Sequence, residues 1–382
     1  MIKILFVINN YFTKGNGLSQ SARRTVKKLK ERGYDVKVLS GGDSITGKKA
    51  DFNLPDLHLP IFDPLVTKQG YIFAKAKKDI IIEAVKWADV IHLEEAFMLE
   101  AKVAKYAKKY NKPITATYHL HPENLFASVN LYRSRILNGV TLFLWKKLCY
   151  NKCKIIQCPT KNVYDRLKKN KFKSELRIIS NGLLLDDLMK KSDVKTYKDN
   201  KYRILAIGRY SIEKDYKTLI KAMKYSKFSK DIELIILGRG PKEKSLKKLA
   251  NKYYKKGIIN NQVKFGFYNM DELQNISSSA DLFIHCAFIE VEGLSLMEAV
   301  QLGIVPIIAK AKLSATSMFA KSDESIYKAK NPIDLASKID YWLSNKELRI
   351  KEAEKYKNMA KDYDIEKSID LLEVMFNDAY NK

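Results

Sequence analysis

Short apolar runs alternate with amphipathic segments along most of the chain. The run Ile2–Ile8 is nearly continuous in large apolar residues, which is typical of a strand buried on both faces of a parallel sheet. A second such run, Asp35–Ser40, follows after an amphipathic segment. The order strand, turn, helix, strand predicts the repeating unit of a doubly wound α/β sheet.

The first amphipathic segment carries helix signals at both of its ends. From Ala22 onward, apolar residues recur at i, i+4 and i+7, so they share one helical face. Ser19 is a candidate N-cap, and Gly33 is placed to end the helix in a left-handed conformation. We therefore expect a helix between the first two strands.

The same alternation continues and falls into two halves. We expect further strands at 89–93, 113–119, 154–158, 176–179, 202–208, 233–237, 263–265, 281–286 and 305–309, with helices between most of them, one at 271–279. Residues 186–201 lose apolar periodicity and are interpreted as a linker. The pattern predicts Rossmann-like domains at residues 1–190 and 191–364. We also expect a C-terminal helix at 365–382 that packs back on the first domain.

The composition fits a folded globular protein. The 382 residues suffice for two domains, and 46% hydrophobic and 11% aromatic residues exclude global disorder. No apolar stretch reaches the length of a membrane span, and the N-terminus lacks signal-peptide features, so we expect a cytoplasmic protein. Its cysteines are expected to be reduced thiols, and their spacing does not favour a zinc site; they are Cys149, Cys153, Cys158 and Cys286.

The chain is strongly basic, with 70 Lys and Arg against 43 Asp and Glu and a formal net charge of +27. Residues 1–195 hold 37 basic and 18 acidic side chains, whereas residues 196–382 hold 33 and 25. The surplus favours a polyanionic partner, although a general lysine bias that only solvates the surface would also produce it. No helix-turn-helix, RNA-binding or zinc-finger motif is present, so we expect no nucleic acid among the partners.

One segment combines positive charge with apolar residues. Residues 131–154 mix Leu, Ile, Phe and Trp with Lys and Arg, and residues 101–177 hold 18 basic but only 3 acidic side chains. A helix of this composition can lie on an anionic surface, which predicts peripheral association with the inner face of the plasma membrane. The alternative is a core helix whose lysine side chains extend into water.

Two loops at predicted strand ends carry residues suited to phosphate. The turn at residues 15–17 places Gly17 at a helix start, where backbone N–H groups can approach an anion, although plain loop glycines would look the same. In the second half, Arg209 and Lys214 follow Gly208 at the end of a strand. A guanidinium and an ammonium there can hold a diphosphate, or they can simply be solvated.

The most specific motif pairs two glutamates across a loop and a helix start. Gly293 permits a sharp turn, and the N–H groups of Leu294 and Ser295 can bind phosphate at the start of the helix. Glu298 lies one turn further on, where its carboxylate can accept hydrogen bonds from a ribose diol, while Glu290 remains in the loop and faces the substrate. A capping carboxylate and a surface glutamate are the plainer interpretation.

Together these motifs resemble the family 4 retaining glycosyltransferases of GT-B fold, of the bacterial glycan or glycolipid type. The elements that carry the resemblance occur in the family's order: the N-terminal glycine turn, Asn181-Gly182, Gly208-Arg209…Glu213-Lys214, Gly238-Arg239-Gly240-Pro241 and Glu290-x7-Glu298. The resemblance covers essentially the whole chain. It implies an α/β protein with two Rossmann-like doubly wound domains that face each other across a cleft.

The resemblance also implies residue roles in the C-terminal domain, which would bind a nucleotide diphosphate sugar. Arg209 and Lys214 would act in catalysis by holding the diphosphate, and Glu298 would hold the ribose. Glu290 would lie by the donor sugar as a catalytic residue. The turn residues Gly238, Gly293, Leu294 and Ser295 complete the expected substrate-binding set, and the family needs no metal.

The N-terminal domain would bind the acceptor. The resemblance places Gly17 near the diphosphate and makes His119 the sugar-contacting, catalytic histidine. We expect His121 to be an ordinary loop residue that faces the same side as His119, and we expect no metal between the two. His92 is expected to be a hydrogen-bonded strand-end histidine.

Four departures from the family pattern concern the sugar end of the donor site. Residues 286–287 are Cys-Ala where Pro-Ser is usual, and Glu292 replaces an aromatic residue. Asp215 replaces a glycine, and residues 314–316 are Ser-Ala-Thr where Gly-Gly is common. The diphosphate and ribose assignments are unaffected, but the sugar remains open.

The implied activity is transfer of a hexosyl unit from a nucleotide diphosphate sugar, with a UDP-sugar favoured, to a saccharide or lipid-linked acceptor. The resemblance implies retention of configuration by front-face transfer, no covalent nucleophile, no cofactor, and a place in cell-envelope polysaccharide or glycolipid synthesis. The alternative is a nucleotide-sugar epimerase or another sugar-nucleotide enzyme of the same double fold.

Overall fold

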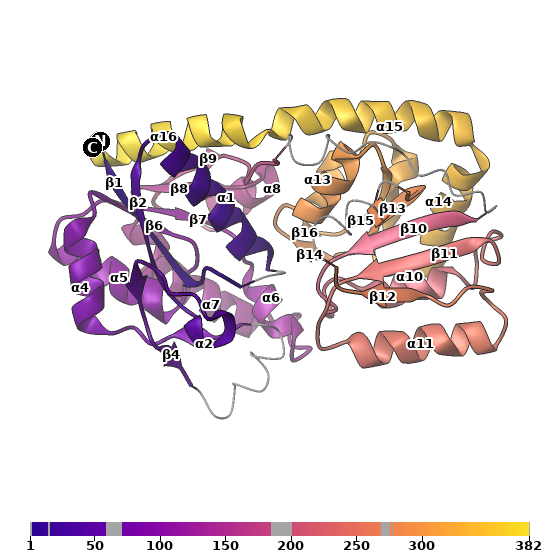
Figure 1. Cartoon of the computed structure of the whole chain (residues 1–382), viewed down its shortest axis with the longest axis horizontal. Helices are drawn as coiled ribbons and strands as arrows, with labels where there is room; N and C mark the ends of the chain where they lie inside the picture. The colour runs from indigo at the N-terminus through magenta and orange to yellow at the C-terminus, as the bar shows by residue number, and fades with distance from the viewer. Residues whose placement is uncertain are drawn as a thin grey trace. The chain divides into compact units, whose positions relative to one another are not determined.

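The computed structural model in Figure 1 describes residues 2–13, 16–58, 71–184, 201–268, 276–277 and 279–381. Contacts divide the chain into two compact units, unit 1 (Met1–Gly182 with Ile365–Lys382) and unit 2 (Leu183–Asp364). The linker expected at 186–201 lies outside the described residues except for Lys201, and so does most of the helix expected at 271–279.

Unit 1 is built on a seven-stranded sheet with the order β3-β2-β1-β6-β7-β8-β9, in which every neighbouring pair is parallel. Its strands are β1 (Lys3–Asn10), β2 (Asp35–Gly41), β3 (Phe52–Asn53), β6 (Val90–Leu93), β7 (Ile114–Thr117), β8 (Ile155–Cys158) and β9 (Glu175–Ile178). The order reverses between β1 and β6, which is the point where doubly wound folds bind ligands. A separate antiparallel pair joins β4 (Asp56–Leu57) to β5 (Phe73–Ala74).

The helices of unit 1 include the last helix of the chain. They are α1 (Gly17–Glu31), α2 (Asp43–Thr46), α4 (Lys78–Trp87), α5 (Met98–Lys109), α6 (Pro122–Ala127), α7 (Arg135–Leu148), α8 (Lys161–Lys169) and α16 (Ile365–Asn381), with a 3-10 turn η1 (Tyr150–Lys152). Helix α16 packs beside α1 and against β6 and β7 (Figure 1). Arg32 fixes it there by donating to Glu366 and Asp370 at 2.6 Å each.

Unit 2 repeats the same strand order, β12-β11-β10-β13-β15-β17, again with parallel pairs. The strands are β10 (Tyr202–Ile207), β11 (Ile232–Leu237), β12 (Lys264–Gly266), β13 (Leu282–His285), β15 (Val305–Lys310) and β17 (Ile326–Lys328), and a small parallel pair joins β14 (Ile289–Glu290) to β16 (Leu313–Ser314). Its helices are α10 (Tyr216–Ala222), α11 (Glu243–Lys255), α13 (Leu294–Gln301), α14 (Pro332–Ser344) and α15 (Lys346–Ala360), with 3-10 turns η2 (Thr316–Phe319), η3 (Asp323–Ser325) and η4 (Lys361–Tyr363).

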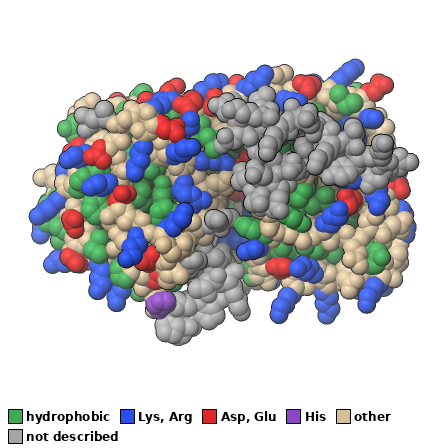
Figure 2. Space-filling model, in the orientation of Figure 1, with side chains coloured by type: hydrophobic (Ala, Val, Ile, Leu, Met, Phe, Trp, Pro, Cys, Tyr) green, Lys and Arg blue, Asp and Glu red, His purple; other side chains and the backbone are tan. Residues whose placement is uncertain are grey.

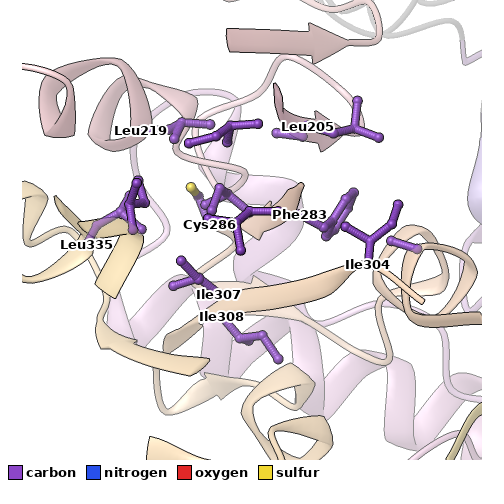
Figure 3. Packing of buried hydrophobic residues seen from close by; sticks show 14 of the residues in the cluster. Leu205, Leu219, Phe283, Cys286, Ile304, Ile307, Ile308 and Leu335 are labelled. Atoms are coloured by element: carbon purple, nitrogen blue, oxygen red, sulfur yellow. The ribbon is translucent and has the colours of Figure 1, made fainter. Parts of the chain in front are cut away.

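The strands of unit 2 bury their branched side chains on both faces. Figure 3 shows Leu205, Phe283 and Ile307 of three neighbouring strands meeting side chains from the helices, among them Leu219 and Leu335. Burial on both faces explains why these strands are continuous apolar runs in the sequence. All four cysteines are buried, unpaired thiols, as expected.

One helix boundary predicted from the sequence is wrong. Asn16, not Ser19, is the N-cap of α1, and its side-chain oxygen accepts a hydrogen bond from the Leu18 N–H at 3.1 Å. The Ser19 hydroxyl instead turns inward and donates to the Asn10 carbonyl at the end of β1. Gly33 has φ +88° just beyond the helix, as predicted.

Charged side chains of both signs are scattered over the viewed face, and helix α7 exposes several apolar residues. On the viewed face, Lys and Arg side chains are interspersed with Asp and Glu (Figure 2). Helix α7 does not lie in the core, because Trp145 is its one buried residue. The core-helix interpretation of residues 131–154 is therefore wrong. Among the described residues, no helix is both long enough and apolar enough to cross a membrane.

Candidate functional site

The carboxyl ends of β10 and β11 approach each other so closely that only glycine fits between them. A Cβ on Gly238 would lie 2.0 Å from the Gly208 carbonyl oxygen, and the Gly238 φ angle is +149°. The Gly238 N–H donates to Gly266 at the end of β12, so three strand ends are joined by backbone contacts. This packing holds the segment that begins at Arg209 against the edge of the sheet.

Arg209 is held by the buried carboxylate of Glu213, which follows it closely in sequence. Its guanidinium donates to Glu213 at 2.9 Å, and Glu213 also accepts from the Ser211 hydroxyl at 2.6 Å. The Glu213 side chain is 3% exposed, whereas that of Arg209 is 35% exposed. One end of the guanidinium is therefore anchored while part of the side chain remains accessible to a ligand.

Lys214 and Glu290 form an ion pair, and His285 lies beside them. Glu290 is the last residue of the short strand β14, so the prediction that it lies in a loop is wrong. Burial by itself would raise the pKa of Glu290, but Lys214 and the nearby His285 ring together lower it below its ordinary value. The His285 Nε2 atom is 3.7 Å from the Glu290 carboxylate. Burial, followed by repulsion from Lys214, lowers the pKa of His285 to about 4, so the imidazole is neutral near pH 7.

His285 is a site residue that the sequence analysis missed. It is 3% exposed, and neither ring nitrogen has a hydrogen-bond partner outside its own residue among the described residues. Its Nε2 atom would lie 3.5 Å from a Cβ on Gly293. The signal was a histidine at the end of a predicted strand and shortly before Glu290, but the sequence alone did not show that its ring turns toward the Glu290 carboxylate.

The start of α13 lies at the same edge of the sheet. Gly293 precedes the helix with φ +89°, and a Cβ there would lie 2.6 Å from the Thr316 side chain. Leu294 and Ser295 are the first helical residues, whose N–H groups precede the intrahelical ladder. The Ser295 hydroxyl donates to the Ile207 carbonyl at 3.2 Å, so it ties α13 to β10, and Glu298 follows one turn later, partly exposed.

The unusual residues 314–316 lie directly beside Glu290. Ser314 pairs with Glu290 in the small parallel sheet of β14 and β16, and the Ala315 N–H donates to the Glu290 carbonyl at 2.9 Å. Thr316 packs against Gly293. The residues that depart from the family pattern are therefore neighbours of the predicted sugar-facing glutamate.

In unit 1, His119 is paired with a buried glutamate that was not predicted. The His119 Nε2 atom is 2.6 Å from the Glu94 carboxylate, and the two residues follow the adjacent strands β7 and β6. Burial would raise the pKa of Glu94, but the charge and hydrogen bond of His119 lower it below its ordinary value. A glutamate after a strand is common in any sequence, so only the pairing reveals its importance.

The two other histidines of this edge differ from each other. The His92 ring nitrogens each lie 2.9 Å from a threonine hydroxyl, of Thr115 and Thr117, which confirms the prediction of a hydrogen-bonded histidine. His121 is not an ordinary loop residue, because it is fully buried and forms the N-cap of α6. Burial lowers its pKa well below the ordinary value, and its Nδ1 atom lies 3.4 Å from the Tyr118 hydroxyl.

Two further buried carboxyl groups, Glu95 and Glu100, follow Glu94 in the chain and form a second cluster. Asn9 donates to Glu95 at 2.9 Å and to Glu100 at 3.0 Å, and the Tyr71 hydroxyl donates to Glu95 at 2.6 Å. Burial, with mutual repulsion added, raises the pKa of Glu100 well above its ordinary value. This cluster joins β1, β6 and α5 through hydrogen bonds to buried carboxyl groups.

The N-terminal glycine turn is described only in part. Gly17 is the first residue of α1 and Asn16 caps it, while Gly15 lies outside the described residues. Across the described ranges, no group of three or more His, Cys, Asp or Glu side chains is arranged to hold a metal ion.

Comparison with known proteins identifies matches over almost the whole chain. Residues 15–187 match the family model described as Glycosyltransferase Family 4, and residues 189–370 match the model described as Glycosyl transferases group 1. An alpha-monoglucosyldiacylglycerol synthase of Acholeplasma laidlawii is 28% identical over 240 residues, which is 58% of either chain and so less than two thirds of that relative. An uncharacterized glycosyltransferase of Haemophilus influenzae is 27% identical over 97% of this chain and 98% of its own.

Solved structures resemble the whole chain in fold. HepE of Anabaena, solved in complex with UDP and glucose, aligns with a TM-score of 0.75 over 99% of this chain and 100% of its own at 16% identity. A sucrose-phosphate synthase of Thermosynechococcus elongatus aligns with a TM-score of 0.78 over 100% of both chains at 13% identity. At such low identity these likenesses establish the fold alone.

Proposed function

Because the chain belongs to the family 4 glycosyltransferases and has the GT-B fold, we propose that it transfers a hexosyl unit from a UDP-sugar to a lipid-linked or saccharide acceptor with retention of configuration. In this proposal unit 2 binds the donor and unit 1 the acceptor. The observation that carries it is the convergence of Arg209, Lys214 and the start of α13 at one edge of the unit 2 sheet.

The proposed role of these groups follows from the charge of the leaving group. Cleavage of the bond between sugar and diphosphate leaves negative charge on the phosphate while the anomeric carbon becomes cationic. Arg209, Lys214 and the N–H groups at the start of α13 would stabilise that charge. Glu213 and Glu290 hold the two cations in place, so little reorganisation is needed when a diphosphate binds.

Glu290 and His119 are proposed to act on the sugar side. Glu290 is kept ionised by Lys214 and can accept hydrogen bonds from donor-sugar hydroxyls. His119 is held by Glu94, which leaves its other ring face and Nδ1 to contact a sugar. Transfer would occur from the face of the departing phosphate, whose oxygen takes the acceptor proton, so no covalent nucleophile is required.

The relatives support particular partners. HepE binds UDP and glucose in its structure, and the Acholeplasma relative is named for a glycolipid product, which supports a UDP-hexose donor and a lipid acceptor. We propose a role in envelope glycolipid or polysaccharide synthesis at the inner face of the plasma membrane. The basic surplus of residues 101–177 supports that location.

A nucleotide-release assay tests the proposed function. The full chain is incubated with UDP-, GDP- and ADP-sugars, each with and without extracted membranes or dispersed diacylglycerol. We expect UDP release from a UDP-hexose that is strongly stimulated by the lipid, together with a glycolipid product whose anomeric configuration matches the donor. Conversion of one UDP-sugar into another without an acceptor would instead identify an epimerase, and preference for a GDP-sugar would correct the nucleotide.

A further inference from the structure

Helix α7 presents a broad apolar face to solvent. Residues one turn apart share a helical face, and the outward positions are apolar at almost every step. Their exposed fractions are 78% for Ile136, 53% for Val140, 60% for Phe143, 44% for Leu144 and 43% for Leu148. Single exposed apolar residues are ordinary, but a contiguous apolar stripe on a surface helix marks an interaction site.

The opposite face of α7 fixes the helix on unit 1. Trp145 is buried and its ring meets Phe97 edge to face at 5.8 Å. At the start of the helix, the Ser134 hydroxyl caps the Leu137 N–H, and Asn138 donates to the Tyr132 carbonyl at 2.7 Å. Since the inner face is already packed, the apolar outer face has no role in the fold of unit 1.

The segment that carries this stripe has charged residues of one sign only. Residues 124–164 contain no Asp or Glu, and seven basic residues lie in that range: Arg133, Arg135, Lys146, Lys147, Lys152, Lys154 and Lys161. The Lys147 ammonium lies over the Phe143 ring at 5.9 Å, so a cation borders the apolar stripe directly. Apolar side chains framed by cations complement a bilayer that has anionic headgroups above an apolar interior.

We propose that α7 is the membrane-docking element of this protein, and that its Ile136–Leu148 face inserts into the headgroup region of an anionic bilayer. This inference extends the proposed function, since it assigns the membrane contact to one surface. It also explains why so much of the basic surplus lies in the first half of the chain. A protein partner would need matching acidic groups, whereas anionic lipid supplies both the charge and the apolar layer.

Co-sedimentation with vesicles tests the proposal without any sugar donor, so its outcome is independent of the transferase assay. The full chain is mixed at physiological salt with phosphatidylcholine vesicles, with or without phosphatidylglycerol. Two double variants of equal charge are compared: Ile136→Asp/Phe143→Asp on α7, and Ile333→Asp/Ile350→Asp on α14 and α15, where the replaced side chains are 59% and 57% exposed. A third variant, Ile136→Gln/Phe143→Gln, removes the apolar groups without adding charge.

We expect the unaltered chain to bind the anionic vesicles, and both α7 variants to lose at least about tenfold in partitioning. The variant on α14 and α15 should change by no more than about twofold, the effect of added charge alone. Absence of binding by the unaltered chain, or an equal loss in the α14 and α15 variant, overturns the proposal. A dimer that dissociates on α7 substitution, with vesicle binding unchanged, would identify a second copy of this chain as the occupant instead.

Discussion

The two units share one strand order but place different acid–base pairs at the carboxyl ends of their strands. In unit 2 the segment after β10 brings Arg209 and Lys214 to the edge, each held by a carboxylate. In unit 1 the segment after β6 brings Glu94 and Glu95, and histidine is the basic partner there. The fold therefore supplies two similar sheet edges. The residues that follow β10 in unit 2 and β6 in unit 1 decide what each edge can bind.

This difference bears on how the two substrates would be recognised. Two permanent cations beside the start of a helix suit a diphosphate, because it carries two negative charges and several hydrogen-bond acceptors. A buried carboxylate paired with a histidine suits hydroxyl groups, which both donate and accept hydrogen bonds. Net charge alone would have suggested the reverse, because the first half of the chain carries most of the basic surplus.

The largest expected effect is loss of a cation from unit 2. We expect Lys214→Ala or Arg209→Ala to reduce kcat/KM by about 10²-fold or more, because each removes a charge that we propose stabilises the leaving phosphate. UDP binding by calorimetry should weaken in both variants. Lys217→Ala is the matched control, since Lys217 is exposed on the same segment and should change turnover by no more than about twofold.

The same assay on a unit 1 variant tests whether the donor nucleotide binds to unit 2 and not to unit 1. His119→Ala should lower turnover with UDP affinity unchanged, because we propose that His119 and its partner Glu94 contact sugar hydroxyls and not the nucleotide. If Lys214→Ala retained full turnover, or if His119→Ala abolished UDP binding, the assignment of the donor to unit 2 would fail.

A second prediction uses two carboxyl groups of unit 1 whose pKa values are shifted in opposite directions. The pKa of Glu94 is lowered, so its contribution to stability is present above its unfolded pKa and is lost as pH falls. The pKa of Glu100 is raised, so its contribution is complete at acid pH and is lost as pH rises through the folded value. Each unit of pKa displacement corresponds to about 1.4 kcal/mol.

Urea unfolding at about pH 4 and about pH 7 checks this pair. Relative to the unaltered chain, Glu94→Gln should be more destabilising at the higher pH, whereas Glu100→Gln should become relatively more favourable there. If the stability difference between variant and unaltered chain changed in the same direction with pH for both variants, the shared burial of these groups, and not their different partners, would govern their titration.

The smallest expected effect concerns the backbone of Asp215, which directly follows Lys214. Asp215 has φ +45° at the N-cap of α10, where the family commonly has glycine, and it accepts a hydrogen bond from the Thr218 hydroxyl at 2.7 Å. Asp215→Ala loses the hydrogen bond and keeps the left-handed backbone, so we expect a loss of about 1–2 kcal/mol. Asp215→Gly loses the same bond but relieves about 1 kcal/mol of backbone strain, and it should unfold close to the unaltered chain. Equal stability of the two variants would contradict the strain argument.

Much of the fold could be predicted because local patterns encode it. The buried strands appear as apolar runs such as Ile2–Ile8, since a sheet covered on both faces tolerates few polar residues. The cap of α1 was misplaced because Asn16 and Ser19 are both good caps in isolation. The choice between them depends on the Asn10 carbonyl at the end of β1, which engages the Ser19 hydroxyl.

The candidate site could be predicted where a motif is continuous in sequence. The Glu290 to Glu298 element and the Arg209 to Lys214 element each lie within a few residues, so their spacing alone suggests their chemistry. Glu94 was missed because its partner His119 comes from the neighbouring strand β7. His285 lies close to Glu290 in sequence, but a histidine at the end of an apolar run belongs to no motif. Whether the apolar residues of 131–154 face the core or water was likewise undecided, because amphipathic patterns do not say which side is packed.

The sequence by itself determined two doubly wound sheets, a candidate phosphate-binding motif in the second half and a basic, partly apolar segment in the first. Only the tertiary structure decided that Lys214 pairs with Glu290, that Glu94 holds His119, and that α7 turns its apolar face outward. The physical reason is that periodicity and backbone turns are local properties. Which side chains meet, and which face remains in water, depends on how strands that are distant in sequence are ordered in each sheet.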